Sequence, residues 1–253
     1  MSRLYIVGSG PGQADYLTQA AVHAIEQSSD VVAYRLYLDL LGQLAVGKVW
    51  HPSPIGQEVM RGRLALDLAV QGKVVSLISS GDAGIYAMAS VIFELIDKTD
   101  NPAYRIIDIE VIPGISALQT LSSRVGAPLG QDFCTISLSD LLTPWSVIES
   151  RIHGAGAGDF VITFYNPVSK QRDWQLAKAR EILLQYRAAD VPVILGKNLT
   201  RDDESVQIST LAEFDVETVD MFTVVMVGNS TTRQFEQWVY TPRGYDVNGS
   251  EST

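Results

Sequence analysis

The stretch SSGDAGIY at residues 79–86 decides the fold because it joins a strand pattern to a helix pattern. The apolar run VVSLI precedes it at residues 74–78, and apolar residues at helical spacing follow it over 86–97. Its two glycines let the backbone of a strand-to-helix loop pass close to a ligand. A turn that only caps the helix uses the same residue types. The rest of the chain has to separate these two readings.

The same arrangement recurs on both sides of this stretch. The apolar run at residues 4–7 ends in GSGPG at 8–12, after which Thr18 is placed to cap a helix that extends to about Ser28. Residues 106–112 end in PGISA at 113–117, which opens a helix that ends near Val125. Ser116 is placed either to bind a ligand or to cap that helix. The repetition predicts an α/β domain with glycine loops.

The second strand pattern, residues 30–34, argues against a dinucleotide site. Such a site needs GxGxxG after the first strand and an acidic residue at the end of the second. The chain has GxGxG, and the strand ends at Tyr34 followed by Arg35. An NAD-binding dehydrogenase is therefore disfavoured. Residues 36–56 predict a loop with a short strand near 49–50, and residues 57–71 predict a helix.

The alternation of strands and helices breaks at residues 126–130, GAPLG. We therefore predict an N-terminal α/β domain at 1–125, a linker at 126–130, a C-terminal α/β domain at 131–245 and a disordered tail at 246–253. The second domain has strand patterns at 133–137, 159–165, 191–195, 204–209 and 222–227. Helices are expected from Thr143 and Pro144 onward and over 171–186. The close spacing of the last strands predicts antiparallel pairing in a mixed sheet.

Composition narrows the classes of function. The chain has 253 residues, 46% of them hydrophobic, which is a globular composition, and a formal net charge of −10. That charge argues against nucleic acid and anionic membranes as partners, because both need a basic surface. Cys134 is the single cysteine, and no Cys/His cluster has metal-ligand spacing. With neither a signal peptide nor a membrane span, we expect a cytoplasmic protein.

Four segments together resemble the tetrapyrrole (corrin/porphyrin) methylases: GSGPG at 8–12, SSGDAGIY at 79–86, PGISA at 113–117 and FYNP at 164–167. Their order and spacing match along nearly the whole chain. Within that family, SLSDLLTPW at 137–145, VVMVGNS at 224–230 and TPRGY at 241–245 resemble the branch that methylates C17 of precorrin-3B and contracts the ring. The rivals are a corrin methylase acting at C11 or C20, and a non-catalytic protein that binds tetrapyrrole or S-adenosylmethionine.

The resemblance implies two α/β/α domains, with S-adenosylmethionine in the interdomain cleft, S-adenosylhomocysteine as product, no protein-bound metal, and a homodimer. Carried over position by position, the cofactor-binding residues are Pro11, Ser80, Gly81, Asp82, Ile85, Ser116, Ala117, Asn166, Leu199, Gly228 and Asn229. Asp82 is the carboxylate expected to face the positive charge of the ligand.

The tetrapyrrole implied as substrate carries carboxylates, which an acidic protein has to meet with local cations. The candidates are Arg35, Arg61, Arg63, Lys170, Arg172 and Arg201. Ring contraction needs proton transfer, for which Tyr34, Asp140 and Glu58 are the candidate catalytic residues. Three positions depart from relatives. Tyr34 stands where uroporphyrinogen methylases carry a catalytic Asp, Gln131 stands where this branch is expected to carry His, and Ala87 stands where the loop would have Gly.

Overall fold

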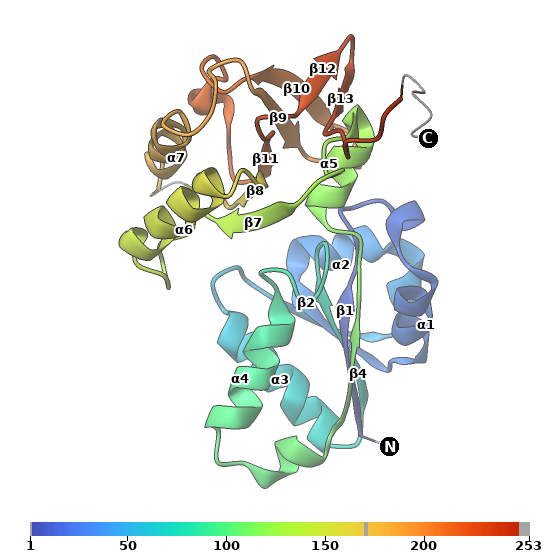
Figure 1. Cartoon of the computed structure of the whole chain (residues 1–253). Coiled ribbons are helices and arrows are strands. Elements are labelled where there is room, and N and C mark those ends of the chain that lie inside the picture. Colours follow the sequence, from blue (N-terminus) through green and yellow to red (C-terminus); the bar gives the residue numbers. More distant parts are fainter. Residues whose placement is uncertain (1, 170–171, 248–253) are drawn as a thin grey trace, which may run out of the picture. The chain divides into compact units, whose positions relative to one another are not determined.

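The computed structural model describes residues 2–169 and 172–247 and divides the chain into two compact units, Met1–Ala117 and Leu118–Thr253. Both units are α/β, as the sequence predicts (Figure 1). Within the described part of the chain, every helix is too short or too polar to traverse a bilayer.

The first unit is built on a five-stranded sheet in the order β3-β2-β4-β1-β5, and all its strand pairs are parallel. The strands are β1 (Arg3–Gly8), β2 (Asp30–Tyr34), β3 (Val49–Ser53), β4 (Val74–Ser79) and β5 (Asp108–Ile112). Because the strands are parallel, all five carboxyl ends lie along one edge of the sheet, where ligands bind in open α/β folds.

Helices cover both faces of this sheet (Figure 1). They are α1 (Gln19–Gln27) and α2 (Arg35–Leu41) on one face, and α3 (Glu58–Val70) and α4 (Met88–Lys98) on the other. In β1, Leu4 and Ile6 pack into the α3–α4 core, whereas Tyr5 and Val7 pack into the core on the α1 side. Burial on both faces explains why the strand is an uninterrupted apolar run.

Local signals set the helix ends with mixed success. The predicted cap of α1 is confirmed, since Thr18 Oγ1 accepts a hydrogen bond from Ala21 N at 3.1 Å. The loop expected over 36–56 is wrong in part, because α2 and a 3-10 helix (Gly42–Ala45) occupy its first half. Buried Leu41, with Tyr37 and Leu44 packed against the same core, explains why this segment is ordered as helix.

The second unit has a mixed five-stranded sheet in the order β10-β9-β11-β8-β7. Its strands are β7 (Phe133–Ser137), β8 (Val161–Tyr165), β9 (Pro192–Lys197), β10 (Ser205–Thr210) and β11 (Thr223–Val227). β7 is parallel to β8, whereas β11 is antiparallel to β8 and β9, and β10 is antiparallel to β9. The predicted mixed sheet is confirmed, and Pro192 is the first residue of its strand, a position that proline tolerates.

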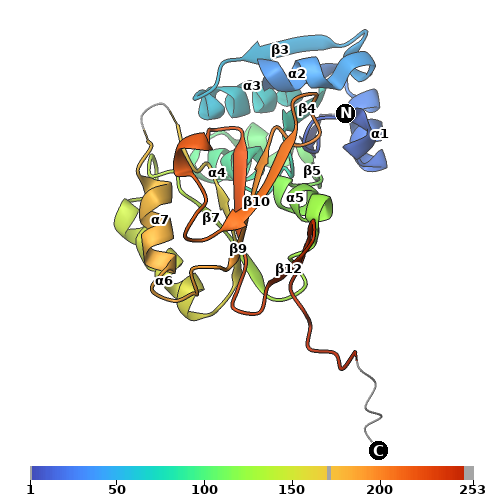
Figure 2. The ribbon, with the colours of Figure 1, turned by 90° about the horizontal axis from the view of Figure 1, so that it is seen from above.

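Helices α6 (Trp145–Ala157) and α7 (Gln175–Leu183) cover one face of this sheet (Figure 2). The hydrophobic core on that face includes Phe164 and Leu176. Helix α5 (Ala117–Val125) packs against the second sheet as well. A Cβ at Gly196 would lie 2.5 Å from Leu121 Cδ1, and Leu118 N donates to Tyr165 Oη at 3.0 Å. The division between the units falls after Ala117, the first residue of α5, whereas the sequence analysis expects it after Val125.

The segment expected as a linker is also built into the second unit. Its first residues form β6 (Gly126–Ala127), which pairs with β13 (Trp238–Tyr240), and β13 pairs with β12 (Arg233–Phe235). Thr241 Oγ1 donates to the Pro128 carbonyl at 2.6 Å. Of the tail expected at 246–253, residues 248–253 lie outside the described residues.

Candidate functional site

Three glycine loops meet at the carboxyl edge of the first sheet. They are residues 8–12 after β1, 79–86 after β4 and 113–117 after β5, and they are neighbours because β1 lies between β4 and β5. Gly10 and Gly81 exchange two backbone hydrogen bonds, from Gly81 N to Gly10 O at 2.7 Å and from Gly10 N to Gly81 O at 3.1 Å. The loops therefore form one connected structure.

These loops approach one another too closely for side chains. A Cβ at Gly114 would lie 2.1 Å from the Gly81 oxygen and 2.7 Å from the Gly8 oxygen, and a Cβ at Gly8 would lie 2.7 Å from Gly114 N. Only glycine fits at either position. Gly8, Gly10 and Gly114 were not among the candidate site residues, although the sequences GSGPG and PGISA carry their signal.

Asp82 fastens two of the loops together. Its Oδ1 accepts from Gly84 N at 2.7 Å within its own loop, and its Oδ2 accepts from Gly114 N at 3.0 Å in the loop after β5. Asp82 therefore has a structural role in addition to the ligand-facing role that the sequence analysis expects. Each carboxylate oxygen has a further lone pair, so both roles are chemically compatible.

The other candidate residues of these loops differ in exposure. Pro11 and Ser116 are buried, whereas Ile85 is 36% exposed and the adjacent Tyr86 is 51% exposed, with a φ of 51°. The three glycine loops thus offer backbone polar groups, one carboxylate and an exposed apolar side chain to a ligand. That set fits a ligand with ammonium, carboxylate and apolar parts, such as S-adenosylmethionine.

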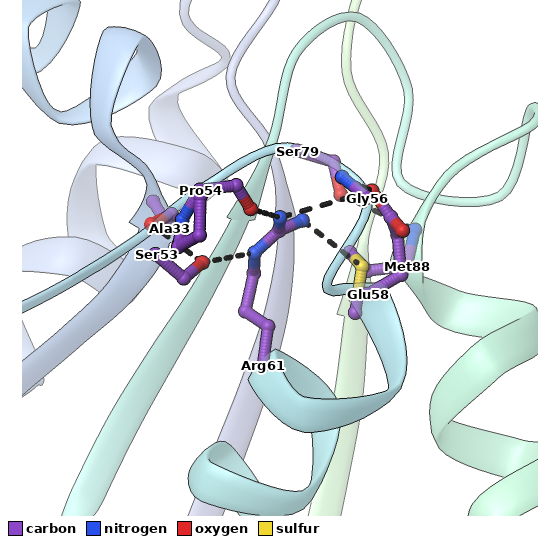
Figure 3. A network of polar contacts seen from close by, with 8 residues as sticks. All are labelled: Ala33, Ser53, Pro54, Gly56, Glu58, Arg61, Ser79 and Met88. Carbon is purple, nitrogen blue, oxygen red and sulfur yellow. Dashed lines mark hydrogen bonds and ion pairs between the residues drawn. The ribbon is translucent and has the colours of Figure 1, made fainter.

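Arg61 lies beneath the same edge and is only 4% exposed (Figure 3). Its Nε donates to Ser53 Oγ at 2.6 Å, its Nη2 donates to the Pro54 carbonyl at 3.0 Å, and its Nη1 lies 3.6 Å from Met88 Sδ. The guanidinium therefore joins the loop after β3 to the start of α4. This burial does not match the expectation of a substrate-binding arginine, and it gives Arg61 a structural role.

Of the other predicted residues of the first unit, Glu58 contacts this network, whereas Arg35, Arg63 and Tyr34 have other surroundings. Glu58 Oε1 accepts from Gly56 N at 3.1 Å and lies 3.8 Å from Arg61 Nη2 (Figure 3). Arg35 and Arg63 are exposed at the surface of α2 and α3. Tyr34 ends β2 half-buried, and its ring packs edge-on against Tyr37, with 5.3 Å between the ring centroids.

The second unit has its own edge of strand ends. β7, β8 and β9 run in the same direction, so Ser137, Asn166 and Leu199 follow their carboxyl ends at one edge. Asn166 has a φ of 51°, and its Nδ2 donates to Ser137 Oγ at 3.1 Å. Leu199 is buried. This edge thus brings together two of the candidate cofactor-binding residues.

The loop that carries Leu199 is held by an ion pair. Arg124 Nε donates to Glu204 Oε1 at 2.6 Å and its Nη2 donates to Oε2 at 3.1 Å, while Thr200 N donates to the same carboxylate. Hydrogen bonding by Arg124 holds the pKa of the Glu204 carboxyl below its ordinary value. The pair joins α5 to the loop between β9 and β10.

Gly228 and Asn229 lie at the opposite edge of this sheet. They follow β11, which is antiparallel to β9, and Gly228 N donates to the Pro192 carbonyl at the start of β9 at 2.9 Å. A strand of this length separates them from Leu199 by roughly 16–20 Å. Asn229 Oδ1 accepts from Thr232 Oγ1 at 3.1 Å, which closes a turn. The structure therefore does not bring this pair together with Asn166 and Leu199.

Most of the remaining candidate residues of the second unit contact other groups of the protein through their side chains. Arg172 is 8% exposed, and its Nη1 donates to the carbonyls of Leu138 at 3.0 Å and Asn166 at 3.2 Å. Asp140 Oδ1 lies 3.8 Å from Arg172 Nε. Arg201 is half-buried over the ring of Phe222. Lys170 lies outside the described residues.

Comparison with known proteins agrees with this architecture. The family of tetrapyrrole (corrin/porphyrin) methylases matches residues 3–215. The chain belongs to this family. The crystal structure of the methyltransferase CobJ superposes on this chain with a TM-score of 0.91, at 36% sequence identity, covering 96% of this chain and 100% of that chain.

Across residues 2–169 and 172–247, no group of three or more His, Cys, Asp or Glu side chains is arranged to hold a metal ion.

Three curated members of the methylase family are similar over 96% of this chain. A cobalt-factor III methyltransferase of Priestia megaterium is 42% identical, and the chain spans 45% of its length. A probable cobalt-factor III C(17)-methyltransferase of Salmonella typhimurium is 43% identical and is covered in full. A precorrin-3B C(17)-methyltransferase of a Sinorhizobium species is 41% identical, with 96% of its length covered.

Proposed function

We propose that this protein transfers a methyl group from S-adenosylmethionine to C17 of precorrin-3B, or of its cobalt-containing counterpart, and contracts the macrocycle. The observation that carries the proposal is the similarity to relatives named C(17)-methyltransferases, which covers 96% of this chain and 96% or more of each relative. The joined glycine loops of the first unit support it, because they form a ligand cradle of main-chain groups.

S-adenosylmethionine, when bound, supplies a methyl group on a positively charged sulfur. The protein's tasks are then to align this group with the acceptor carbon and to exclude water. The loops 8–12, 79–86 and 113–117 are suited to alignment, since they are fixed to one another by the Gly10–Gly81 hydrogen bonds and by Asp82. Ile85, partly exposed beside them, offers apolar contact.

The acceptor is a tetrapyrrole with several carboxylates. Arg35 and Arg63 on the first unit, and Arg201 on the second, remain proposed contacts for these groups because their side chains reach the surface. Tyr34 is the proposed proton donor or acceptor in ring contraction. Glu58 and Asp140 are the other candidates for that role, and each carboxylate accepts one hydrogen bond from the protein, from Gly56 N and from Gln175 Nε2. On the family resemblance we also propose a cytoplasmic homodimer.

The experiment is mass spectrometry of the tetrapyrrole recovered after incubation with S-adenosylmethionine and precorrin-3B, with and without cobalt in the ring. A gain of one methyl group together with the spectrum of a contracted ring is the expected result, and the better substrate identifies the natural form. Calorimetric titration with S-adenosylhomocysteine is run in parallel. Binding without methyl transfer to either substrate contradicts the C17 assignment and favours a sister methylase or a binding protein.

A further inference from the structure

The loop after β7 exposes two adjacent leucines. Leu141 is 76% exposed and Leu142 is 99% exposed, between the end of β7 at Ser137 and the start of α6 at Trp145. A single exposed leucine is ordinary, but adjacent apolar side chains exposed to this extent form a contiguous apolar patch, and such patches mark contact surfaces. The two leucines are therefore a candidate contact surface for another molecule.

The loop is fastened on its β7 side. Leu138 N donates to the Tyr165 carbonyl at 2.9 Å, and the Leu138 carbonyl accepts from Arg172 Nη1 at 3.0 Å. Asp140 Oδ2, directly before the leucines, accepts from Gln175 Nε2 at 3.0 Å. Arg172 and Gln175 are 8% and 1% exposed, so the fastening groups are themselves buried.

The loop is also fastened on its α6 side. The ring of Trp145 packs edge-on against that of Trp174, with 4.8 Å between their centroids. Trp145 also packs against the hydrophobic core of the second unit. With both ends fixed, the exposure of the leucines is a property of the folded loop.

This loop adjoins the edge that carries candidate cofactor residues. Arg172 Nη1 donates to the carbonyls of both Leu138 and Asn166, at 3.0 and 3.2 Å. Ser137 Oγ accepts from Asn166 Nδ2 at 3.1 Å and from Ser139 N at 3.3 Å. The leucine loop and the Asn166 position are thus joined by the same two side chains.

We propose that Leu141 and Leu142 form the apolar contact for one face of the tetrapyrrole macrocycle, with Arg172 as the positioning residue of their loop. The inference rests on the proposed function, because the occupant is its substrate. A macrocycle of this class has apolar faces and carboxylates at its rim, so it needs apolar side chains over its face and cations around it. Two leucines held outward at the end of a sheet strand supply the first requirement without a polar group.

The test is the double variant Leu141→Ser/Leu142→Ser compared with Leu184→Ser, a matched control at the end of α7 that is 40% exposed. The double variant is expected to raise KM for the tetrapyrrole by about tenfold to thirtyfold, from the loss of two apolar contacts. The S-adenosylhomocysteine affinity and the thermal unfolding temperature are expected to stay at the wild-type values. Leu142→Met is expected to keep the wild-type KM, because it retains apolar contact.

Other results overturn the inference. An unchanged KM in the double variant shows that the leucines do not touch the substrate. Dissociation of an oligomer, seen by light scattering, with unchanged KM assigns the pair to contact between two copies of the chain. If the wild type transfers no methyl group, the proposed function fails separately, and absorbance titration with precorrin-3B still decides: equal affinity of wild type and double variant, or no binding by the wild type, refutes the contact.

Discussion

Arg61 and Arg63 offer a direct test of burial against substrate binding, because sequence reasoning gave both the same role. They lie two positions apart on α3, but Arg61 is buried whereas Arg63 is exposed. We compare Arg61→Gln with Arg63→Gln, which makes the second variant a matched control. The first is expected to reduce the stability of the fold and the second to leave it nearly unchanged.

The magnitude follows from the partners of Arg61. Its two close hydrogen bonds, to Ser53 Oγ at 2.6 Å and to the Pro54 carbonyl at 3.0 Å, come from a charged donor in a buried place. Such bonds contribute about 1.5–3 kcal/mol each, and glutamine at this position replaces at most one of them. The free energy of unfolding is therefore expected to fall by about 2–4 kcal/mol, which lowers the unfolding temperature by roughly 4–16 °C.

Thermal unfolding followed by circular dichroism measures this change, and steady-state kinetics with the tetrapyrrole measures KM. Arg61→Gln is expected to unfold at a lower temperature than the wild type, whereas Arg63→Gln is expected to have the unfolding temperature of the wild type. The reasoning is refuted if both variants unfold at the wild-type temperature while Arg61→Gln alone raises KM about tenfold or more. That result would make Arg61 a substrate contact after all.

Three further predictions concern the loops and the ion pair. Gly114→Ala is expected to weaken S-adenosylhomocysteine binding at least about tenfold by calorimetry, because its Cβ would lie 2.1 Å from the Gly81 oxygen; Gly154→Ala, with open space around it, is the control. Wild-type affinity in Gly114→Ala would contradict the close approach. Asp82→Asn replaces one accepting oxygen with an amide NH2 that faces a backbone N–H, so the urea midpoint of this variant is expected to fall by the equivalent of about 1–3 kcal/mol. An unchanged midpoint argues against a stabilising role of the Asp82 hydrogen bonds between the two loops. Arg124 lowers the pKa of the Glu204 carboxyl in the folded protein, so this ion pair stabilises the fold at neutral pH and the stabilisation is lost as the pH falls through that pKa. Glu204→Gln is therefore expected to make the urea midpoint depend less steeply on pH in the acid range. A dependence as steep as that of the wild type would count against the pair.

The sequence predicts β1 and β4 well because each is an apolar run followed by a glycine-containing loop. β1 and β4 are each extended by one or two residues relative to the runs at 4–7 and 74–78. Their loops were found for the same reason, since a glycine after an apolar run marks a tight turn. The segment of α2 was missed because its helix is short and follows β2 without a capping signal, as Tyr34 makes no side-chain cap.

Other features depend on contacts far apart in the chain. The apolar side of α5 shows that the helix packs, but only the contact of Leu121 with Gly196 shows against which sheet. The placement of Gly228 beside Pro192 follows from the antiparallel direction of β11, which local sequence does not specify. The burial of Arg61 and Arg172 runs against the usual exposure of arginine, so composition and spacing favoured the surface for both.

The contact of the three glycine loops through main-chain atoms has a consequence for redesign. A pocket lined by side chains is enlarged by shortening them, but Gly8, Gly81 and Gly114 have no side chain to shorten. Under the function proposed above, this scaffold would accept a bulkier sulfonium donor only after a change in loop length or in the stagger of β1 against its neighbours. In a saturation library, we expect every replacement at Gly8 and Gly114 to be lost, while many replacements at the exposed Ile85 survive selection.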